Sequence, residues 1–154
     1  LLGLSAEGVS PAAERLRQPE RGGAAVHRAV VATTARQQRF DWTQPMRIWD
    51  LPPECLCRQH LLGEHRELHA LWSILTQGKP GFANHPETRR WRGKRKALFL
   101  RHDQLVAEMQ RRGYRHRSPL PAALATGAAV QTEYVDTPEE QRRLLREKGC
   151  GCGV

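Results

Sequence analysis

Three titratable side chains, those of His60, Glu64 and Glu67, follow one another at four- and three-residue steps. In a helix this spacing places all three on one face. An imidazole and two carboxylates on one face have the chemistry of a general acid/base site or of half a metal site. From spacing alone, an ordinary solvated face with surface ion pairs is the more common explanation. The chain's first methionine, Met46, precedes this face closely, which suggests an active site built around a chain terminus.

Four cysteines form two close pairs, Cys55 with Cys57 and Cys150 with Cys152. No secretion signal is evident, so we expect reduced thiols. On a helix, Cys55 and Cys57 point about 200° apart, which disfavours a shared metal ion. Cys150-Gly-Cys152 could form half of a metal site or a redox pair, in a C-terminal run expected to be mobile. We therefore predict no metal ligand and no cofactor, and keep a cysteine-dependent metal or redox module as an alternative class.

A basic tract extends from Arg89 to Arg101 with seven Lys or Arg residues, no acidic residue and Trp91 among them. The formal net charge of the chain is +9, and residues 46–120 hold nearly all of the excess. Such a tract neutralises phosphates and gives salt-sensitive, largely sequence-independent affinity for nucleic acid. The indole could stack on a base or wedge into a duplex. The alternative is a solvated helix face with Trp91 in the core.

The elements that must position these groups are predicted to be helical. From about Pro53 to Gln77, apolar residues recur at three- and four-residue steps, and Gly78 follows as a helix-ending residue. Near the C-terminus, Thr137-Pro-Glu-Glu140 has the pattern of a capping box with proline in the first turn. It predicts a short helix that ends at Lys148.

A second long helix is expected from Glu87 or Arg92 to Arg112, in which Gly93 marks a kink or a break. No segment alternates strictly enough to form a strand. The sequence therefore predicts an all-α fold: a compact single domain of two long helices plus a short C-terminal helix, with irregular loops.

Residues 46–154 are expected to form this domain. Residues 1–45 are rich in Ala, Arg, Gly and Gln and offer little apolar surface to bury. We expect them to be a disordered extension or the product of a mis-assigned start. No apolar run approaches the roughly 18 residues that a membrane helix needs, so no membrane partner is predicted.

Several short motifs occur in an order that carries more information than any one of them. They are Arg47-Ile48, Gln59-His60-Leu61, Glu64, Arg66-Glu67-Leu68, Gly78-Lys79, Ala107-Glu108 and Arg112-Gly113-Tyr114. In this order and spacing, residues 46–120 resemble the pyrimidine-dimer DNA glycosylase/endonuclease V family, of phage type with a bacterial branch. The Thr-Pro-Glu-Glu-Gln and Lys-Gly-Cys stretches near the C-terminus resemble that bacterial branch.

The resemblance implies a mechanism in which the α-amine of the chain attacks C1′ of the damaged nucleotide and β-elimination then nicks the strand. The nucleophile is then the α-amine of Met46, and Glu67 stabilises the cationic imine and moves protons. The resemblance implies that Arg47 and Arg66 bind the phosphates that flank the damaged nucleotide. It also implies that Gln59 and His60 line the cleft. The residues expected to contact DNA are Arg47, Gln59, His60, Arg66, Lys79, Arg89, Arg90, Trp91 and Lys94.

Three features depart from the family pattern. Met46 stands where the phage enzyme exposes a threonine amine, so an amine exists only in a chain that begins at Met46. His69-Ala70 stands where the family has another DNA-contacting arginine. The C-terminal Gly-Cys-Gly-Cys-Gly run has no counterpart of the phage enzyme's aromatic tail. These departures favour abasic-site lyase chemistry over strict pyrimidine-dimer specificity.

The sequence thus predicts a DNA repair enzyme, a glycosylase/AP lyase acting on pyrimidine dimers or abasic sites in double-stranded DNA. We expect it to act as a monomer in the cytoplasm, at the nucleoid. The alternative is a non-catalytic nucleic-acid-binding helical protein that keeps the basic surface.

Overall fold

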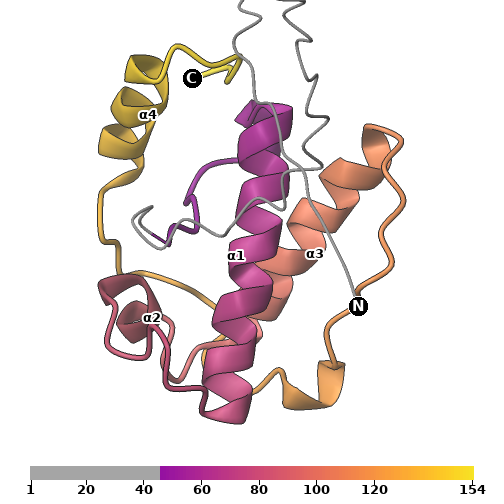
Figure 1. Cartoon of the computed structure of the whole chain (residues 1–154), viewed down its shortest axis with the longest axis vertical. Helices are drawn as coiled ribbons and strands as arrows, with labels where there is room; N and C mark the ends of the chain where they lie inside the picture. The colour runs from indigo at the N-terminus through magenta and orange to yellow at the C-terminus, as the bar shows by residue number, and fades with distance from the viewer. Residues whose placement is uncertain (1–45) are drawn as a thin grey trace, which may run out of the picture. The chain divides into compact units, whose positions relative to one another are not determined.

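The computed structural model describes residues 46–154, which are helical and contain no β-strand. The elements are η1 (Pro53–Cys55), α1 (Arg58–Gln77), α2 (Pro86–Arg90), α3 (Arg95–Arg111), η2 (Ala122–Leu124) and α4 (Pro138–Glu147). The long helices α1 and α3 pack against each other (Figure 1). Helix α4 is attached through Gln141 to Asp50, in the segment that precedes η1. The predicted all-α fold is confirmed. The predicted extension, residues 1–45, lies outside the described residues.

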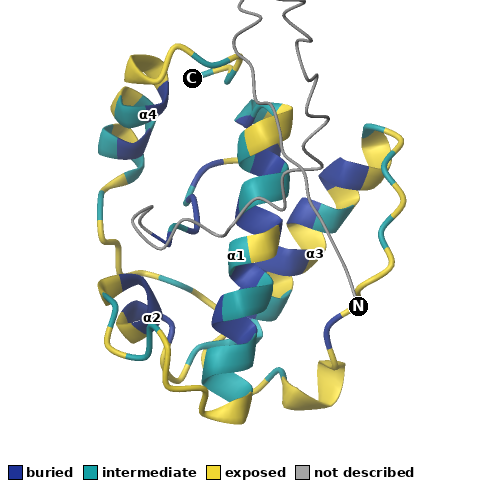
Figure 2. Ribbon diagram, in the orientation of Figure 1, coloured by how far each residue is buried: buried dark blue, intermediate teal, exposed yellow. Residues whose placement is uncertain are grey.

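Helix α1 is amphipathic, and its buried stripe faces α3 (Figure 2). Each leucine moved from water into this core contributes roughly 1.5–3 kcal/mol to stability. The helix begins at Arg58 rather than at Pro53, because residues 53–55 form a separate 3-10 turn. It ends where Gly78 adopts φ 64° and donates its N–H to the Ile74 carbonyl at 3.1 Å. The apolar side chains of the stripe are Leu61, Leu68, Leu71 and Trp72.

The predicted second long helix is divided into α2 and α3 at the turn around Gly93, where φ is 71°. A distant segment fills this break. Its residue Gly127 passes so close that a Cβ there would lie 2.0 Å from the Gly93 carbonyl oxygen, so only glycine fits. Backbone carbonyls of Thr126 and Ala128 accept the N–H groups of the first turn of α3 at 2.9 and 3.0 Å. The segment therefore satisfies helix donors that would otherwise lack partners.

A buried ion pair joins α1 to α3. Arg101 donates from Nε and Nη2 to the two Glu64 oxygens at 2.8 and 3.1 Å, and Glu64 is only 1% exposed. Burial raises the pKa of Glu64 to about 7, and the Arg101 guanidinium opposes that rise. The pair fixes how the two helices face each other, since either charge alone in this place is unfavourable.

We expect Arg101→Met to lower the free energy of unfolding at pH 8 by roughly 3–5 kcal/mol, because it leaves the Glu64 carboxylate buried without a partner. The double variant with Glu64→Gln should recover part of this loss. Denaturant unfolding measures both. The matched control is Arg143→Met, which breaks an exposed pair on α4 and should change stability little. An Arg101→Met protein as stable as the control would contradict the assignment.

Candidate active site

The extended segment 46–51 passes between α1 and α4 (Figure 1). Side chains of α2 and α4 hold it in place. Arg90 of α2 donates to the Ile48 carbonyl and to Asp50 Oδ1, both at 3.0 Å. Gln141 of α4 accepts from the Asp50 N–H at 2.7 Å and donates to Asp50 Oδ2 at 2.9 Å. Four side chains of the segment enter the core, those of Met46, Ile48, Trp49 and Leu51. The position of its first residues is therefore determined by the fold.

Glu67 of α1 lies against the peptide that joins Met46 to Arg47. The Arg47 N–H donates to Glu67 Oε2 at 2.5 Å. The Arg47 guanidinium contacts Asp136 at 2.6 Å and lies 5.0 Å from the centroid of the Trp49 ring system. Only three covalent bonds separate the Met46 nitrogen from the Arg47 nitrogen. An α-amine at Met46 would therefore lie within reach of the Glu67 carboxylate.

The pKa of Glu67 is raised to about 7, chiefly by burial and further by the nearby Glu87 carboxylate. The Arg47 N–H and the charges of Arg47 and Arg66 oppose the rise. Because the folded pKa lies above the unfolded value, ionising Glu67 destabilises the fold as pH rises from about 4.5 to about 7. At neutral pH both protonation forms are populated, which suits a group that both accepts and donates a proton.

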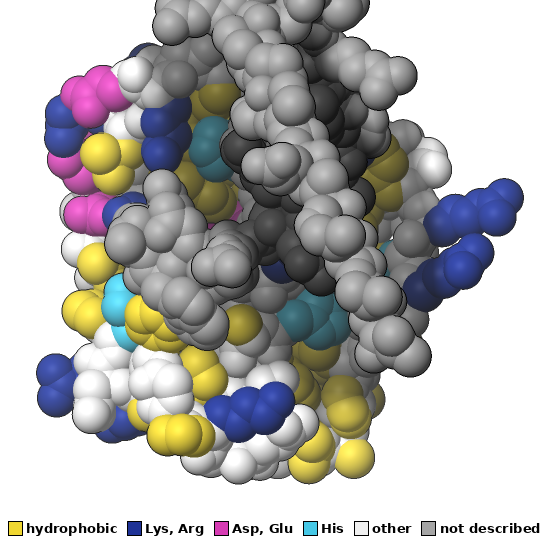
Figure 3. All heavy atoms as spheres, in the orientation of Figure 1, with side chains coloured by type: hydrophobic (Ala, Val, Ile, Leu, Met, Phe, Trp, Pro, Cys, Tyr) yellow, Lys and Arg dark blue, Asp and Glu magenta, His cyan; other side chains and the backbone are white. Residues whose placement is uncertain are grey.

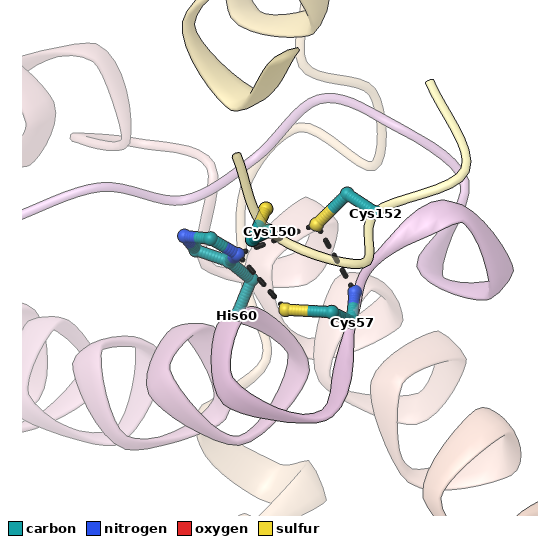
Figure 4. Close-up of side chains that lie close together, drawn as sticks. All are labelled: Cys57, His60, Cys150 and Cys152. Atoms are coloured by element: carbon teal, nitrogen blue, oxygen red, sulfur yellow. Dashed lines mark hydrogen bonds between the residues drawn. The ribbon is translucent and has the colours of Figure 1, made fainter. Parts of the chain in front are cut away.

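The predicted His60/Glu64/Glu67 face does not behave as one site. Glu64 is buried against Arg101, and so this face is not simply solvated. His60 instead points to the cysteines: its Nδ1 lies 3.1 Å from Cys57 Sγ and 3.3 Å from Cys152 Sγ (Figure 4). The His60 ring also lies edge-on to Trp49, with 5.7 Å between the ring centroids. Of the three residues, Glu67 is the one that accepts a hydrogen bond from the first peptide of the segment that starts at Met46.

Four of the predicted DNA-contacting residues, Gln59, Arg66, Lys79 and Arg89, are exposed. Arg66 adjoins Glu67, and its positive charge acts to lower the pKa of Glu67. Lys79 follows the C-terminus of α1, roughly 15–18 Å along the helix axis from Glu67. Lys79 therefore cannot contact the same nucleotide as Glu67.

Arg90 and Trp91 belong to the core rather than to the basic surface, with only 5% and 2% of their area exposed. Both donate to Glu87 Oε1, Arg90 Nε at 2.8 Å and Trp91 Nε1 at 3.0 Å. Stacking of Trp91 on a base would require it to leave the core and break that bond. We therefore remove both residues from the DNA-contacting set, because each has a structural partner instead.

Lys94 is also engaged: its Nζ lies 2.9 Å from Glu133 and 2.8 Å from Gln131. Exposed cations remain elsewhere. Arg115 and Arg117 are exposed in the segment after α3, where Figure 3 shows Lys and Arg side chains projecting outward. Over α4, in contrast, acidic and basic side chains are mixed (Figure 3). The positive surface therefore includes only part of the basic tract, with Arg89 and Arg92 exposed, and it also includes cations from the segment after α3.

A groove of about 850 Å³ is lined by η1, α3 and residues 129–134, and Glu67 is not among its lining residues. Two of its ionisable groups already have partners: Arg101 is paired with Glu64, and Glu108 with Arg111 and Arg112. The Arg111 and Arg112 guanidinium groups lower the pKa of Glu108 to about 2. We place the candidate active site at Glu67, where a carboxyl group can exchange a proton near neutral pH.

Two clusters of side chains could each hold a metal ion. Sequence reasoning named Cys150-Gly-Cys152 as a possible half of a metal site, but it missed the partners of that pair and the whole of the second cluster. One is formed by Cys57, His60, Cys150 and Cys152, and the other by His65, His69, His102 and His116. Within each cluster all ligand atoms lie within 4.8 Å of one another. The spacings Cys-x-x-His and His-x-x-x-His on α1 were available signals, but the partners from elsewhere in the chain were not. Cys55 stays outside, as its spacing from Cys57 suggested.

The C-terminal run packs against the rest of the fold. The prediction that this run is mobile is therefore wrong. The Gly153 N–H donates to the Cys55 carbonyl at 2.8 Å, and Cys150, Cys152 and Val154 pack against the core. Within residues 46–154, no helix is long and apolar enough to cross a bilayer.

Residues 46–122 match the sequence model of a family described as pyrimidine dimer DNA glycosylase. The match begins at Met46 and contains Glu67 and the helices α1 to α3, whereas α4 and the C-terminal cysteines lie beyond it. No curated protein and no solved structure matches the chain.

Proposed function

The chain belongs to the pyrimidine dimer DNA glycosylase family, and we propose that it is a glycosylase/AP lyase acting on pyrimidine dimers or abasic sites in double-stranded DNA. The nucleophile is the α-amine of Met46 in a chain that begins there. One observation carries the proposal: Glu67, with its pKa raised to about 7, contacts the peptide nitrogen next to Met46.

The chemistry follows from these two groups. The lone pair of the amine attacks C1′, the bond from C1′ to the base breaks, and the base leaves with a proton. The C1′–O4′ bond then opens, O4′ takes a proton, and an iminium ion forms between the amine and C1′. An abasic sugar is attacked at the same carbon and loses water. An α-amine has a reference pKa of about 8, so a useful fraction is neutral at physiological pH. The iminium ion then loses a proton from C2′ to the Glu67 carboxylate, and the C3′–O bond breaks with release of the 3′-phosphate.

The surrounding charges suit a DNA backbone. Arg66 precedes Glu67 in the sequence, Arg47 contacts it through the backbone N–H, and the charges of both arginines act on it. We assign both guanidinium groups to the phosphates beside the opened nucleotide. Gln59 and Arg89 extend this surface. Extrusion of a nucleotide costs a few kcal/mol and is easiest at a damaged or abasic position. We propose that the enzyme acts as a monomer on nucleoid DNA in the cytoplasm.

Strand cleavage tests this function against the alternative of a non-catalytic DNA-binding protein. The chain starting at Met46 is incubated with duplexes carrying one pyrimidine dimer, one abasic site or no lesion. We expect a nick with a 3′-unsaturated aldehyde and a 5′-phosphate on at least one damaged duplex, and none on the undamaged control. Tight binding without any nick would favour the non-catalytic protein.

The elimination step should depend on pH with an apparent pKa near 7. Glu67 removes the C2′ proton only as a carboxylate, so the rate should rise from pH 5 to about 7 and then level off. Single-turnover decay of the preformed imine isolates this step from amine attack. A rate that is flat over this range would remove Glu67 from the role of base.

Arg66→Ala and Arg89→Ala should each weaken binding of abasic duplex by about 3- to 10-fold and reduce the salt slope by about 1, because each removes one phosphate contact. Fluorescence anisotropy at several salt concentrations measures both quantities. Arg143→Ala is the matched control, since Arg143 is paired with Glu140 and Glu147 on α4. If all three variants bind alike, the phosphate contacts lie elsewhere.

A further inference from the structure

The cysteine cluster lies at the N-terminal end of α1, away from Glu67. We propose that Cys57, His60, Cys150 and Cys152 bind one zinc ion. The ligand atoms are three thiol sulfurs and His60 Nδ1, all within 4.8 Å of one another. Figure 4 shows them gathered between the first turn of α1 and the C-terminal run. Three thiolates and one imidazole are a ligand set that structural zinc prefers.

The distances fit one ion. Tetrahedral zinc, with Zn–S bonds of about 2.3 Å and Zn–N bonds of about 2.0–2.1 Å, holds sulfur and nitrogen ligands about 3.6 Å apart. In the structure His60 Nδ1 lies 3.1 Å from Cys57 Sγ and 3.3 Å from Cys152 Sγ. For an ion at the centre, each of these two sulfur–nitrogen pairs needs to separate by about half an ångström or less.

The local structure explains why these residues meet. Cys57 is the N-cap residue of α1 and His60 lies in the first turn, so both project from the same end of the helix. Gly149, with φ 61°, ends α4 and leads into Cys150-Gly-Cys152. The hydrogen bond from Gly153 to Cys55 then fixes this run beside α1.

Several neighbouring groups would stabilise metal-bound thiolates. The Cys57 N–H donates to Cys152 Sγ at 3.1 Å, and such backbone donors orient and stabilise metal-bound sulfur. The N-terminus of the 20-residue helix α1 adds a partial positive charge at Cys57. The Lys148 ammonium acts on His60 and would offset the net charge of −1 of zinc with three thiolates. Cys150 Sγ lies 3.5 Å from the Leu145 carbonyl, a thiol contact that zinc binding would replace.

A disulfide, an iron–sulfur cluster or another metal ion fits these four residues less well than a single zinc ion does. A disulfide would use two of the three sulfurs and leave His60 and the third thiol without a role, and the structure contains no disulfide among the four cysteines. An iron–sulfur cluster contains several metal atoms and would hold its ligands farther apart than a single ion does. Soft thiolates also disfavour magnesium and calcium, which prefer oxygen ligands.

Zinc at this site would close a loop from Cys57 to Cys152 and attach the C-terminal run to α1. It would also engage the ring of His60, which the family resemblance placed in the DNA cleft. The site is therefore structural in role, and its loss should reduce thermal stability before it affects the chemistry at Glu67.

Thiol protection combined with metal analysis tests the site on the untagged full chain, purified with zinc under reducing conditions. We expect Cys55 to be alkylated quickly, and the other three cysteines to be alkylated only after a strong chelator is added. Cobalt(II) in place of zinc should give a near-ultraviolet sulfur-to-cobalt charge-transfer band. Equal alkylation of all four thiols, a disulfide within the cluster, or no charge-transfer band would each overturn the proposal.

Two variants complete the test. Cys152→Ser should lose the cobalt charge-transfer band or weaken it at least tenfold, whereas the matched control Cys55→Ser should keep both the band and the full zinc content. If Cys152→Ser does not fold, the protection pattern of the wild-type thiols still decides. A Cys55→Ser protein that loses as much zinc as Cys152→Ser would contradict the assignment.

A different observation carries a second inference, at the histidine cluster. His65 and His69 lie one turn apart on α1, His102 lies on α3, and His116 lies in the segment that follows α3. Four ring nitrogens here are buried without a hydrogen bond: His65 Nε2, His69 Nε2, His102 Nδ1 and His102 Nε2. Of these, His102 Nδ1 lies 3.6 Å from Asp103 Oδ1, which is longer than a hydrogen bond. An unpartnered buried polar atom costs about 1–3 kcal/mol, so four in one place call for an explanation.

We infer that these four imidazoles bind a divalent first-row transition-metal ion such as zinc or cobalt. Imidazole is the common ligand of this class, and one cation accepts the lone pairs of all four rings. His116 Nε2 lies 3.3 Å from Ser118 Oγ, which leaves its Nδ1 for the ion. A hydrogen bond from the other ring nitrogen is the usual support of a metal-bound histidine.

The metal content and the cobalt(II) spectrum of variants should distinguish the two sites in one experiment with cobalt(II) and zinc(II). The wild-type chain should hold two equivalents of metal. Cys57→Ser/Cys152→Ser should keep one equivalent whose cobalt spectrum lacks the sulfur band, and His69→Ala/His116→Ala should keep one equivalent with it. No metal in the cysteine double variant, or two equivalents in the histidine double variant, would overturn the second inference and leave the first standing.

Discussion

A chain that begins at Met46 is expected to nick abasic duplex at least about 100-fold faster than the chain in which residues 1–45 precede it. The reason is the nitrogen at Met46. As an α-amine it has a free lone pair, whereas in a peptide bond the lone pair is delocalised into the carbonyl and cannot form an imine. Single-turnover cleavage with enzyme in excess measures the difference.

The control for this comparison is the shorter chain with its α-amine acetylated. It should bind abasic duplex as the unmodified chain does and nick it as slowly as the longer chain. Equal rates for the free and the acetylated chain would mean that a side chain supplies the nucleophile. The lysines of the described residues would then be the candidates.

Glu67→Gln is expected to lower the rate of β-elimination by about 10²- to 10⁴-fold, because the amide cannot accept the C2′ proton. The substitution keeps an oxygen that can accept from the Arg47 N–H, so the segment 46–51 should stay in place. It also removes a carboxylate whose ionisation opposes folding above pH 7. The variant should therefore be at least as stable as the wild type at pH 8, so lost activity would not reflect unfolding.

The matched control is Glu139→Gln, which changes an exposed residue in the first turn of α4 and should leave the rate unchanged. Rates are compared after imine formation, so that slower attack by the amine does not mimic slower elimination. A Glu67→Gln enzyme that eliminates as fast as Glu139→Gln would exclude Glu67 as the base.

The helices could be predicted because their signals are local. Thr137 illustrates this: its side chain accepts from the Glu140 N–H at 3.3 Å, as the capping box indicates. Gly78 likewise ends α1 where the sequence places its end. Neither residue depends on a partner from a distant part of the chain.

The interpretation of the basic tract depended on distant partners and was only partly right. The sequence pattern predicts that Arg90 and Arg101 are surface cations. In the structure Arg90 pairs with Glu87 and Asp50, and Arg101 pairs with Glu64, all inside the fold. A charge pattern along the sequence does not reveal carboxylates that approach from other elements. Trp91 was uncertain for the same reason, since a core residue and a base-stacking residue have the same local sequence.

The candidate active site was predicted only through the family resemblance, because spacing alone left His60, Glu64 and Glu67 equivalent. In the structure each has a different partner: Cys57 for His60, Arg101 for Glu64 and the Arg47 N–H for Glu67. The two metal-type clusters could not be predicted, since each combines a helical spacing on α1 with residues from α3 or from the C-terminal run.

The most direct measurement identifies the atom of the protein that becomes attached to DNA. The chain beginning at Met46 is mixed with abasic duplex, the imine is reduced with borohydride, and the adduct is digested and sequenced by mass spectrometry. The proposed mechanism predicts that the added sugar remnant is on the α-nitrogen of Met46. A remnant on a lysine side chain, or no adduct despite strand cleavage, would contradict it.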